Sequence, residues 1–539
     1  MVDFCYPNFL SNLSDFRNSY VNPIKNGLYS DSDASAKRLS TLRMKVLQRL
    51  LAPVVDRRDS SLLYHVLPRK VEYIISCPLA DVQRELYVSY IEHFCNMATA
   101  DDRNLNKDLL LHGSTLTTIC NHPAICKAKL AYHRKLLSRK DAKRIKQITL
   151  MEFAEGDDSE LVDVETLKST ADEGWTRDVF ERHSQMVELQ GARQRISVEE
   201  LQSPTLSLKM LILLEIISKS VALGERVLVF SRSIQTMDYI QRVVKDLRVA
   251  VGPTTPFMQS GIVRIDGSTP VVDRQMLIDQ FNAPKSPHNM FLISSMTGSL
   301  GINLVSASRV VIFDVGWNPL YDEQAVARAY RYGQRRRVYV YRLMTTGTWE
   351  ERLFANNVFK VSMTRRVVDK QTMGRRVNKE DMKKYFELPP SDPPKITGMA
   401  RDELLKDYSD DVVFASVMAS YQDNISSVTP DATLLANEDE NLSQEDMAHL
   451  EALFIREKQR LGQLPPPLQP TQPQVQQTMA LANGVDGLYA APLPAPHSLP
   501  LPLPTVASPD KQQNTPSSSS IGRGPLIPMQ TCMLPVQPV

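Results

Sequence analysis

Five short apolar runs, rich in β-branched residues, constrain the fold of this chain more than any other feature. In chain order they are RVLVF (226–230), IVRID (262–266), MFLISS (290–295), RVVIFD (309–314) and RVYVYRLM (337–344). Helical patterns separate most of them, for example at residues 234–247 and 270–281. Strands that are apolar along nearly their whole length and alternate with helices are typical of a parallel sheet covered on both faces. The sequence therefore predicts an α/β domain at about residues 205–370.

The rest of the chain divides by composition and periodicity into four predicted regions. Residues 1–125 are mainly helical, with a strand at VEYIISCPL (71–79) between two helical patterns. Residues 126–204 contain a basic helix followed by an acidic, irregular segment, which we interpret as a flexible insertion. Residues 371–462 form a partly helical extension whose last helix opens with Ser443 as a cap. Residues 463–539, rich in Pro and Gln, are predicted to be disordered, because they bury too little apolar surface to offset chain entropy.

Charge, cysteines and hydropathy exclude several classes of protein. The formal net charge of +2 gives no general attraction for a polyanion, although nine Lys or Arg lie within residues 127–146. That stretch is either a solvated basic face or a DNA-facing or nuclear-targeting segment. Cys120, His122 and Cys126 lie close together, but no second ligand pair follows, so we expect no metal site. The first residues do not resemble a secretory signal, and no apolar run reaches the length of a membrane span. We therefore expect a soluble intracellular protein without a membrane partner.

The loops after the predicted strands are the places where a ligand would bind, because open parallel sheets bind ligands at the carboxyl ends of their strands. DGST (266–269) offers two hydroxyls suited to a phosphate, yet its residues are also those of a plain turn, which is the better interpretation of this loop alone. TGSLGIN (297–303) has only two glycines and lacks the GxGxxG pattern of a dinucleotide site. A dinucleotide-dependent enzyme is thereby disfavoured. Trp317, in DVGWNP (314–319), is by itself best interpreted as a core aromatic.

The segment QAVARAYRYGQ (324–334) carries Arg328 and Arg331 three positions apart. On a helix this spacing places both side chains on one face, and Gly333 is expected to end that helix. Two guanidinium groups on a buried helix end need anionic partners, and the γ-phosphate of a nucleoside triphosphate is one such partner.

Taken in order, these motifs resemble the second RecA-like lobe of the Swi/Snf-type branch of superfamily-two helicases, and most of all its ATRX-like group. The resemblance is strong over residues 205–370 and weaker over residues 1–125, where NPIKNG (22–27), LYVSYIEHF (86–94) and ICNHPAIC (119–126) recur. It implies a RecA-like parallel sheet with helices on both faces. It also implies that residues 1–125 form an inter-lobe or protrusion region, and that residues 205–370 are the helicase C-terminal lobe.

The resemblance also implies roles for individual residues. Arg328 and Arg331 would be arginine fingers that contact the phosphates of ATP, and Trp317 would couple DNA contact to closure around ATP. The other residues of the ATP motifs would be Gly301, Asn303, Gln324, Gly333 and Gln334. The residues that would hold the backbone of double-stranded DNA are Arg232, Ser268, Thr269, Ser295 and Thr297. Three positions depart from the family pattern, because the family often has Gln in place of Arg232 and a basic-Ala pair in place of Met296 and Thr297.

Such an enzyme binds ATP and Mg²⁺ mainly through a first lobe with a GxxxxGK[ST] loop, and this sequence contains no Gly-Lys pair. DEGW (172–175) imitates the acidic box that completes the metal site, but no apolar strand precedes it. In the family, a sequence like MVDF follows the last motif of the first lobe, so Met1 is expected to be an internal methionine of a longer chain. The resemblance thus implies the C-terminal half of an ATP-dependent double-stranded-DNA translocase or chromatin remodeller in the nucleus.

The alternative is a non-catalytic short form that binds DNA or protein partners and inhibits the full enzyme. The Pro-rich tail is then either a polyproline ligand for partner domains or a passive segment.

Overall fold

The computed structural model of the chain describes ten separate ranges, all of which belong to one compact unit, residues 1–467. Within these ranges, no helix has the length and apolar character that a membrane span requires. Most of the predicted basic helix, the acidic insertion and the Pro-rich tail lie outside the described residues. The described residues are 2–56, 63, 65–92, 102–129, 199–251, 261–296, 301–367, 385–396, 398–430 and 443–463.

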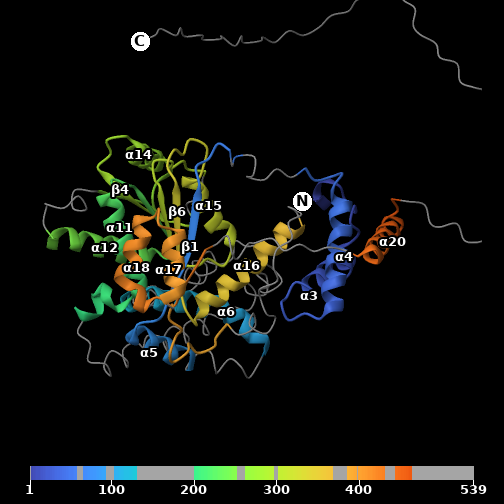
Figure 1. Ribbon diagram of the computed structural model, residues 1–539, viewed down its shortest axis with the longest axis horizontal. Helices are drawn as coiled ribbons and strands as arrows, with labels where there is room; N and C mark the ends of the chain where they lie inside the picture. Colours follow the sequence, from blue (N-terminus) through green and yellow to red (C-terminus); the bar gives the residue numbers. More distant parts are fainter. Residues whose placement is uncertain are drawn as a thin grey trace, which may run out of the picture. The chain divides into compact units, whose positions relative to one another are not determined.

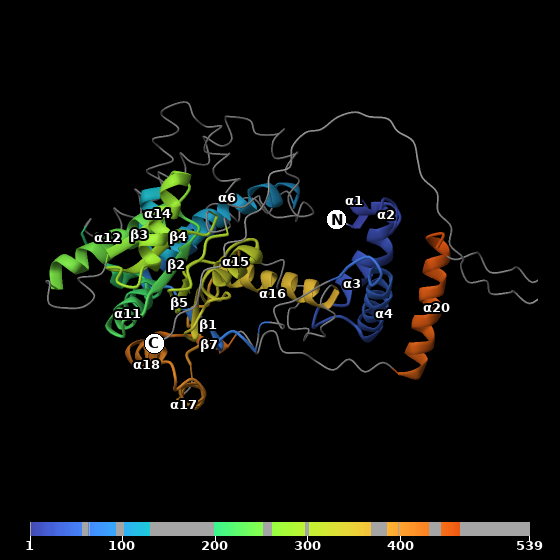
Figure 2. The same ribbon diagram turned by 90° about the horizontal axis from the view of Figure 1, so that it is seen from above.

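The core of the unit is a sheet of seven strands in the order β3-β4-β2-β5-β6-β1-β7. The first six strands are mutually parallel, and β7 is antiparallel to β1. Helices flank the sheet on both sides, as Figures 1 and 2 show, so the predicted α/β fold is confirmed. In chain order the strands are β1 (Lys70–Cys77), β2 (Val227–Ser231), β3 (Gly261–Ile265), β4 (His288–Ser294), β5 (Arg309–Ile312), β6 (Val338–Thr345) and β7 (Ser427–Pro430).

Two strands enter this sheet from outside residues 205–370. β1 was expected as a strand, but within the helical region; instead it pairs with β6 along its whole length, from Lys70 opposite Val338 to Cys77 opposite Thr345. β7 was not expected, because four residues that end in Pro430 carry no clear strand signal. Sequence periodicity reports that a segment is extended, and it does not report which neighbour the segment pairs with.

Strict alternation along the strands assigns the helices to the two faces. On β2, Val227 and Val229 point into one cluster and Leu228 and Phe230 into the other. The first cluster packs α11 (Leu208–Ala222), α12 (Ile234–Val251) and α18 (Val412–Tyr421) against the sheet. The second packs α14 (Val271–Asn282) and α15 (Pro319–Ala329) against the opposite face. Because both faces are covered, the strands are apolar throughout, and this produced the continuous runs seen in the sequence.

A third cluster joins the end of β6 to helices of the N-terminal region. Trp349 and Leu353 begin α16 (Trp349–Val367) and pack with residues of α5 (Asp81–Tyr90) and α6 (Asp102–Asn121). The far end of α16 reaches α4 (Ala34–Leu51) and the residues before it, where Phe359 stacks on Tyr29 at 4.9 Å. α16 therefore contacts both α6 and α4.

The last described helix, α20 (Gln444–Arg460), packs on α4. Ser443 caps it as predicted, because its side chain accepts a hydrogen bond from the backbone N of Asp446 at 3.1 Å. Leu450 is buried against α4, and Arg49 of α4 lies 5.7 Å from the ring centroid of Phe454. The interface thus combines an apolar contact with a cation–π contact.

The extension after the predicted lobe, which includes α17 (Gly398–Asp407), α18 and β7, is held to the sheet by a buried ion pair. Arg309 of β5 pairs with Asp411, the residue that caps α18, and both side chains are almost completely buried. Asp411 also accepts a hydrogen bond from the hydroxyl of Tyr341 at 2.7 Å. The guanidinium of Arg309 lies 4.2 Å from the ring centroid of Tyr339.

We predict that Asp411→Ala weakens the attachment of α18 by about 3–5 kcal/mol, because it leaves the charge of Arg309 buried with one counter-ion fewer. The readout is the opening free energy of α18 from amide hydrogen exchange. Asp410→Ala is the matched control: Asp410 pairs with Arg337, both side chains are largely exposed, and we expect a change of at most about 1 kcal/mol. Equal effects of the two variants would contradict the role of the buried pair.

His112 lies in α6 and His122 lies just after it, and burial keeps both side chains neutral. The Nε2 of His122 lies 2.9 Å from both the carbonyl oxygen of Ser203 and the hydroxyl of Tyr239, and its ring stacks on Tyr239. Burial lowers the pKa of each histidine to about 4. Among the described residues, no group of three or more His, Cys, Asp or Glu is placed to hold a metal ion.

The sign of the resulting pH effect follows from the direction of the shift. Between pH 6.5 and pH 4 the unfolded chain binds protons that the folded chain does not, so this stabilisation is complete above pH 6.5 and is lost as the pH falls. We predict that His122 accounts for a loss of about 2 kcal/mol in unfolding free energy between pH 7 and pH 5. In urea titrations, the unfolding free energy of His122→Phe should therefore fall by about 2 kcal/mol less than that of the wild type between pH 7 and pH 5. Parallel pH profiles of the two proteins would show that His122 is not held neutral.

Candidate functional site

The carboxyl ends of three neighbouring strands bring most of the predicted DNA-contact residues to one edge of the sheet. Arg232 follows β2, Ser268 and Thr269 follow β3, and Ser295 follows β4. The ends of β2 and β4 are linked directly, because the backbone N of Ser295 donates to the carbonyl oxygen of Ser231 at 3.0 Å. Thr297 lies outside the described residues. We call this row of strand ends the carboxyl edge.

The DGST loop on this edge is a closed turn. Asp266 accepts hydrogen bonds from both the backbone N and the hydroxyl of Ser268, and its backbone N donates to the hydroxyl of Thr269 at 3.1 Å. Burial raises the pKa of Asp266, but these bonds and Arg264 outweigh it and leave the pKa below its usual value. Ser268 is exposed, so it is accessible to a phosphate once its hydroxyl turns away from Asp266. Ser295, in contrast, is buried, and its hydroxyl is not presented at the surface.

Asp314, in the loop after β5, organises the middle of the carboxyl edge. Its Oδ2 accepts hydrogen bonds from the hydroxyl of Ser231 at 2.6 Å and from the side-chain amide of Asn121 at 3.1 Å. Its Oδ1 accepts from the backbone N of Arg232 at 2.9 Å. This carboxylate is 1% exposed, so it fixes the loop after β2 without direct contact with solvent.

Behind Asp314 lies a buried polar network that the sequence did not reveal. Lys209 of α11 donates to the Oδ1 of Asn121 at 2.9 Å and to both carboxylate oxygens of Glu350 at 3.0 Å. Glu350, in the first turn of α16, also accepts from the hydroxyl of Thr345 at 2.8 Å. The only part of this network with a signal in the sequence was Asn121, which lies in the segment ICNHPAIC that resembles the family. In the sequence, Lys209 and Glu350 look like ordinary residues of a helix.

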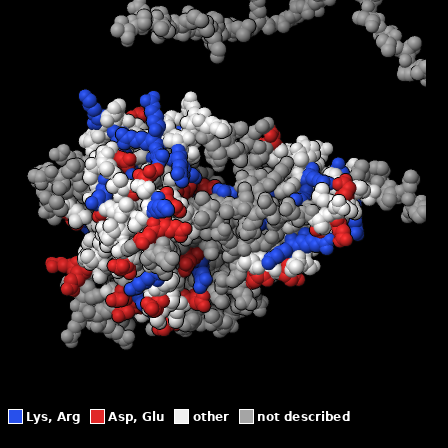
Figure 3. Space-filling view, in the orientation of Figure 1, with Lys and Arg blue, Asp and Glu red and all other residues white. Residues whose placement is uncertain are grey.

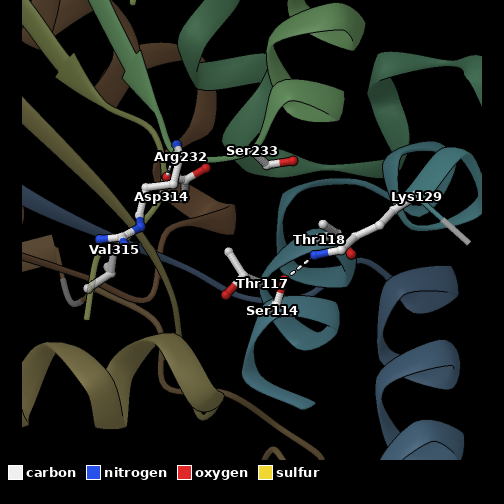
Figure 4. A pocket seen from close by; sticks show the side chains of 8 residues that line it. All are labelled: Ser114, Thr117, Thr118, Lys129, Arg232, Ser233, Asp314 and Val315. Atoms are coloured by element: carbon white, nitrogen blue, oxygen red, sulfur yellow. Dashed lines mark hydrogen bonds between the residues drawn. The ribbon is translucent and has the colours of Figure 1, made fainter. Parts of the chain in front are cut away.

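A small cavity lies between α6 and the loops after β2 and β5 (Figure 4). Its volume of about 20 Å³ is enough for a water molecule. Lys129 forms a hydrogen bond with Ser114 on one side of it, and the guanidinium of Arg232, on the other side, lies 5.8 Å from the ring centroid of Tyr321. The residues that line the cavity are Ser114, Thr117, Thr118, Lys129, Arg232, Ser233, Asp314 and Val315. Residues of the N-terminal region therefore complete the carboxyl edge.

The arginine pair lies at the end of α15, with one correction to the prediction. Asn318 caps the helix, which ends at Ala329, so Arg331 lies in the following turn and does not share a helical face with Arg328. The backbone leaves the helix four residues before Gly333, whose φ of +101° allows the turn that follows. Burial first, and then the charge of Arg331, lower the pKa of Arg328.

Arg331 is exposed and donates to the carbonyl oxygen of Gly301 at 3.3 Å. The backbone N of Leu304 donates to the carbonyl oxygen of Arg328 at 3.0 Å. The loop between β4 and β5 therefore touches the arginine pair through both Gly301 and Leu304. Asn303, in the same loop, is exposed, and its carbonyl oxygen accepts a hydrogen bond from the side chain of Asn282.

Gln334 is fully engaged within the protein. Its side-chain amide donates to the carbonyl oxygens of Ala307 and Ala329, and its Oε1 accepts from the backbone N of Arg335 and of Arg336. All of its hydrogen-bonding capacity is used to shape the turn after α15, which gives it a positioning role. Gln324 is half-buried, and no described residue donates a hydrogen bond to its Oε1.

Trp317 is a core residue, as its sequence context alone indicated. It is 4% exposed, and its ring centroid lies 6.2 Å from that of Trp349. Lys360 of α16 lies 4.8 Å from its ring centroid, and the side chain of Asn357 donates to the carbonyl oxygen of Gly316 at 2.6 Å. The loop between β5 and α15 is thus held from one side by α16.

On the face shown in Figure 3, Lys and Arg gather over the region of α14 and β4 and are mixed with Asp and Glu elsewhere. Arg226 and Arg335–Arg337 precede β2 and β6 and therefore lie at the opposite, amino edge of the sheet. The carboxyl edge is distinguished by hydroxyl, amide and backbone N–H groups held in a network around Asp314.

Two family models match the chain in two separate regions. The SNF2-related domain matches residues 1–125, and the helicase conserved C-terminal domain matches residues 208–333. β1 lies in the first matched region and β2 to β5 lie in the second, and all five strands belong to one sheet.

Curated relatives match across both regions. Protein CHROMATIN REMODELING 20 of Arabidopsis thaliana is 34% identical over 405 residues, which is 73% of this chain and 26% of that protein. Helicase ARIP4 of Homo sapiens is 34% identical over 391 residues, which is 68% of this chain and 26% of the relative. The Transcriptional regulator ATRX homolog of Drosophila melanogaster is 31% identical over 454 residues, which is 75% of this chain and 34% of the relative.

The chain thus spans about a quarter to a third of the length of these relatives. The matched models, the relatives and the parallel α/β sheet agree with the motif order in the sequence. The chain belongs to the SNF2 family of helicase-like ATPases, within its ATRX group.

Proposed function

We propose that this chain supplies the DNA-gripping second lobe and the arginine fingers of an ATP-dependent double-stranded-DNA translocase that remodels chromatin in the nucleus. The carboxyl edge would hold the phosphate backbone of the duplex through Arg232, Ser268 and Thr269. Arg328 and Arg331 would contact the phosphates of ATP bound by a first lobe. Contacts to the backbone position a protein on DNA without reading its sequence, which suits a motor that moves along any duplex.

One observation carries this proposal. The loop after β4 starts at Ser295, which is hydrogen-bonded to the end of β2, and six positions later Gly301 accepts a hydrogen bond from Arg331. One short loop therefore joins the proposed DNA contacts to the proposed ATP contacts. We infer that ATP contact and DNA contact are coupled, because the two sets of residues are joined by this short connection in the sequence.

Each proposed group has a defined chemical task. The guanidinium groups of Arg328 and Arg331 would stabilise the negative charge that develops on the transferred phosphoryl group. Mg²⁺ would neutralise the same phosphates, but the described residues offer no acidic cluster that could hold it, so its ligands would come from the first lobe. Trp317, in the loop after β5 and held by α16, would couple DNA contact to closure around ATP.

The second candidate function is a non-catalytic one, and the absence of any Gly-Lys pair in the sequence favours it for this chain on its own. Such a form would bind DNA through the same carboxyl edge. Its Pro-rich tail would occupy protein partners without hydrolysis of ATP.

We predict that this chain alone hydrolyses no ATP above background, with or without duplex DNA. Mixed with a family first lobe that carries a GxxxxGK[ST] loop, it should show DNA-stimulated hydrolysis. In the mixture, Arg331→Ala should lower that rate by about 10³-fold or more, the effect expected for an arginine finger. Arg335→Ala, four positions away and also exposed, serves as the control and should retain the activity.

Two outcomes would contradict this assignment. Hydrolysis by the chain alone that Arg331→Ala removes would reveal a complete phosphate site within these 539 residues. Full activity of Arg331→Ala in the mixture would show that Arg331 is not a finger.

Binding of the chain to a 30-base-pair duplex tests the DNA contacts separately. We predict that its affinity falls linearly on a log–log plot against salt, and equally for unrelated duplex sequences. Arg232→Ala should reduce the magnitude of that slope by about 0.9, the value for one phosphate contact. Arg336→Ala, at the amino edge, should leave the slope unchanged, and the reverse pattern would place the duplex on the amino edge.

A further inference from the structure

Asn121 is the point at which the N-terminal region meets the carboxyl edge. It is the last residue of α6, it is completely buried, and its amide lies between Lys209 and Asp314. We propose that Asn121, oriented by Lys209 and Glu350, is a positioning residue that sets the backbone of Arg232 for contact with a DNA phosphate. This inference rests on the proposed function and adds to it a residue outside the helicase C-terminal match.

The orientation of the Asn121 amide is fixed by charge on both sides. Its Oδ1 accepts from the ammonium of Lys209 at 2.9 Å, and its Nδ2 donates to the carboxylate of Asp314 and to the hydroxyl of Thr236, both at 3.1 Å. A flipped amide would place its NH₂ against the ammonium and its oxygen against the carboxylate. Both contacts would be repulsive, so only the observed orientation satisfies every group.

The backbone of Asn121 is anchored as well. Its carbonyl oxygen accepts from the hydroxyl of Ser207 at 2.7 Å, the residue that caps α11. Lys209 lies in the first turn of the same helix. The start of α11 thus holds Asn121 through both its backbone and its side chain, and the amide has little freedom to move.

From Asn121 the constraint passes to Arg232 through one carboxylate. The Oδ2 of Asp314 accepts from Asn121 and Ser231, while its Oδ1 accepts from the backbone N of Arg232. With both oxygens engaged, the carboxylate cannot rotate without breaking a bond. Removal of the Asn121 amide would leave Oδ2 with the bond from Ser231 but without the one that ties it to α6, and so loosen the loop that carries Arg232.

The buried pair of Lys209 and Glu350 has a geometric effect beyond stability. Both side chains are almost completely removed from solvent, and a buried pair of this kind often adds little net stability because desolvation is costly. Glu350 is itself fixed at the end of β6, since it accepts from the backbone N and the hydroxyl of Thr345. The pair therefore fixes the position of the Asn121 amide relative to the end of β6 and the start of α16.

The test measures the salt dependence of duplex binding by the full chain and its variants. Asn121→Ala should raise Kd about tenfold at low salt and reduce the slope by about 0.9, as Arg232→Ala does. When Asn121→Ala and Arg232→Ala are combined, the slope should fall no further than in either single variant, because both changes remove the same phosphate contact. The double variant Lys209→Met/Glu350→Gln removes both buried charges and should show the same salt slope as Asn121→Ala. If Asn121→Ala does not fold, this double variant takes its place in the test.

Asn356→Ala separates positioning from general loss of stability. Asn356 is a comparably buried asparagine in α16 whose side chain donates to the hydroxyl of Tyr385 at 2.8 Å, outside the Asp314 network. This variant should unfold more easily and keep the wild-type slope. A wild-type slope in folded Asn121→Ala, or additive effects in the double variant with Arg232→Ala, would overturn the proposed role of Asn121.

The same experiment separates failure of this inference from failure of the proposed function. Absence of duplex binding by the wild type would overturn the proposed DNA contact, and the positioning role with it. If Arg232→Ala reduces the salt slope as predicted and Asn121→Ala leaves it unchanged, the positioning role alone is overturned.

Discussion

The parallel pairing of β1 with β6 joins two regions that are separated by more than 250 positions in the sequence, and the site depends on it. β1 precedes α5 and α6, so its place in the sheet sets where these helices can pack. The end of α6 then delivers Asn121 to the carboxyl edge, beside Asp314. Without that strand pairing, the loop after β5 would lack its partner from the N-terminal region.

α16 connects the buried polar network and the loop after β5 to α4 and Tyr29. Its first turn holds Glu350 in the buried network, its middle holds the loop of Gly316 and Trp317, and its later residues pack on α4 and Tyr29. A movement of α4 relative to the sheet would therefore act on one helix that contacts both the polar network and the loop after β5. This physical continuity is what a two-lobed motor would need to relate its two parts.

Much of the fold could be predicted from the sequence, because buried parallel strands have a simple pattern. The five apolar runs each became a strand within a few residues of the predicted bounds, and Ser443 capped its helix. The pattern could not place β1, because strand pairing depends on tertiary contacts. It also missed β7, whose four residues are too short for a periodic signal.

The site was predictable only in part, for a similar reason. Motif order placed Arg232 after β2 and Ser268 after β3 as the structure has them, because it follows local chain geometry, but it wrongly put Arg331 on the helix of Arg328. The Lys209–Glu350 pair was not foreseen, since its members lie 141 positions apart and carry no local signal. Gln334 matched a motif, but its use in shaping the turn after α15 became visible only from its four hydrogen bonds.

The most direct test of the account is an experimental structure of this chain bound to a short DNA duplex. The account predicts that backbone phosphates lie within hydrogen-bond distance of Arg232, Ser268 and Thr269, with Asn121 still between Lys209 and Asp314. A duplex bound at the amino edge, against Arg335–Arg337, would contradict it.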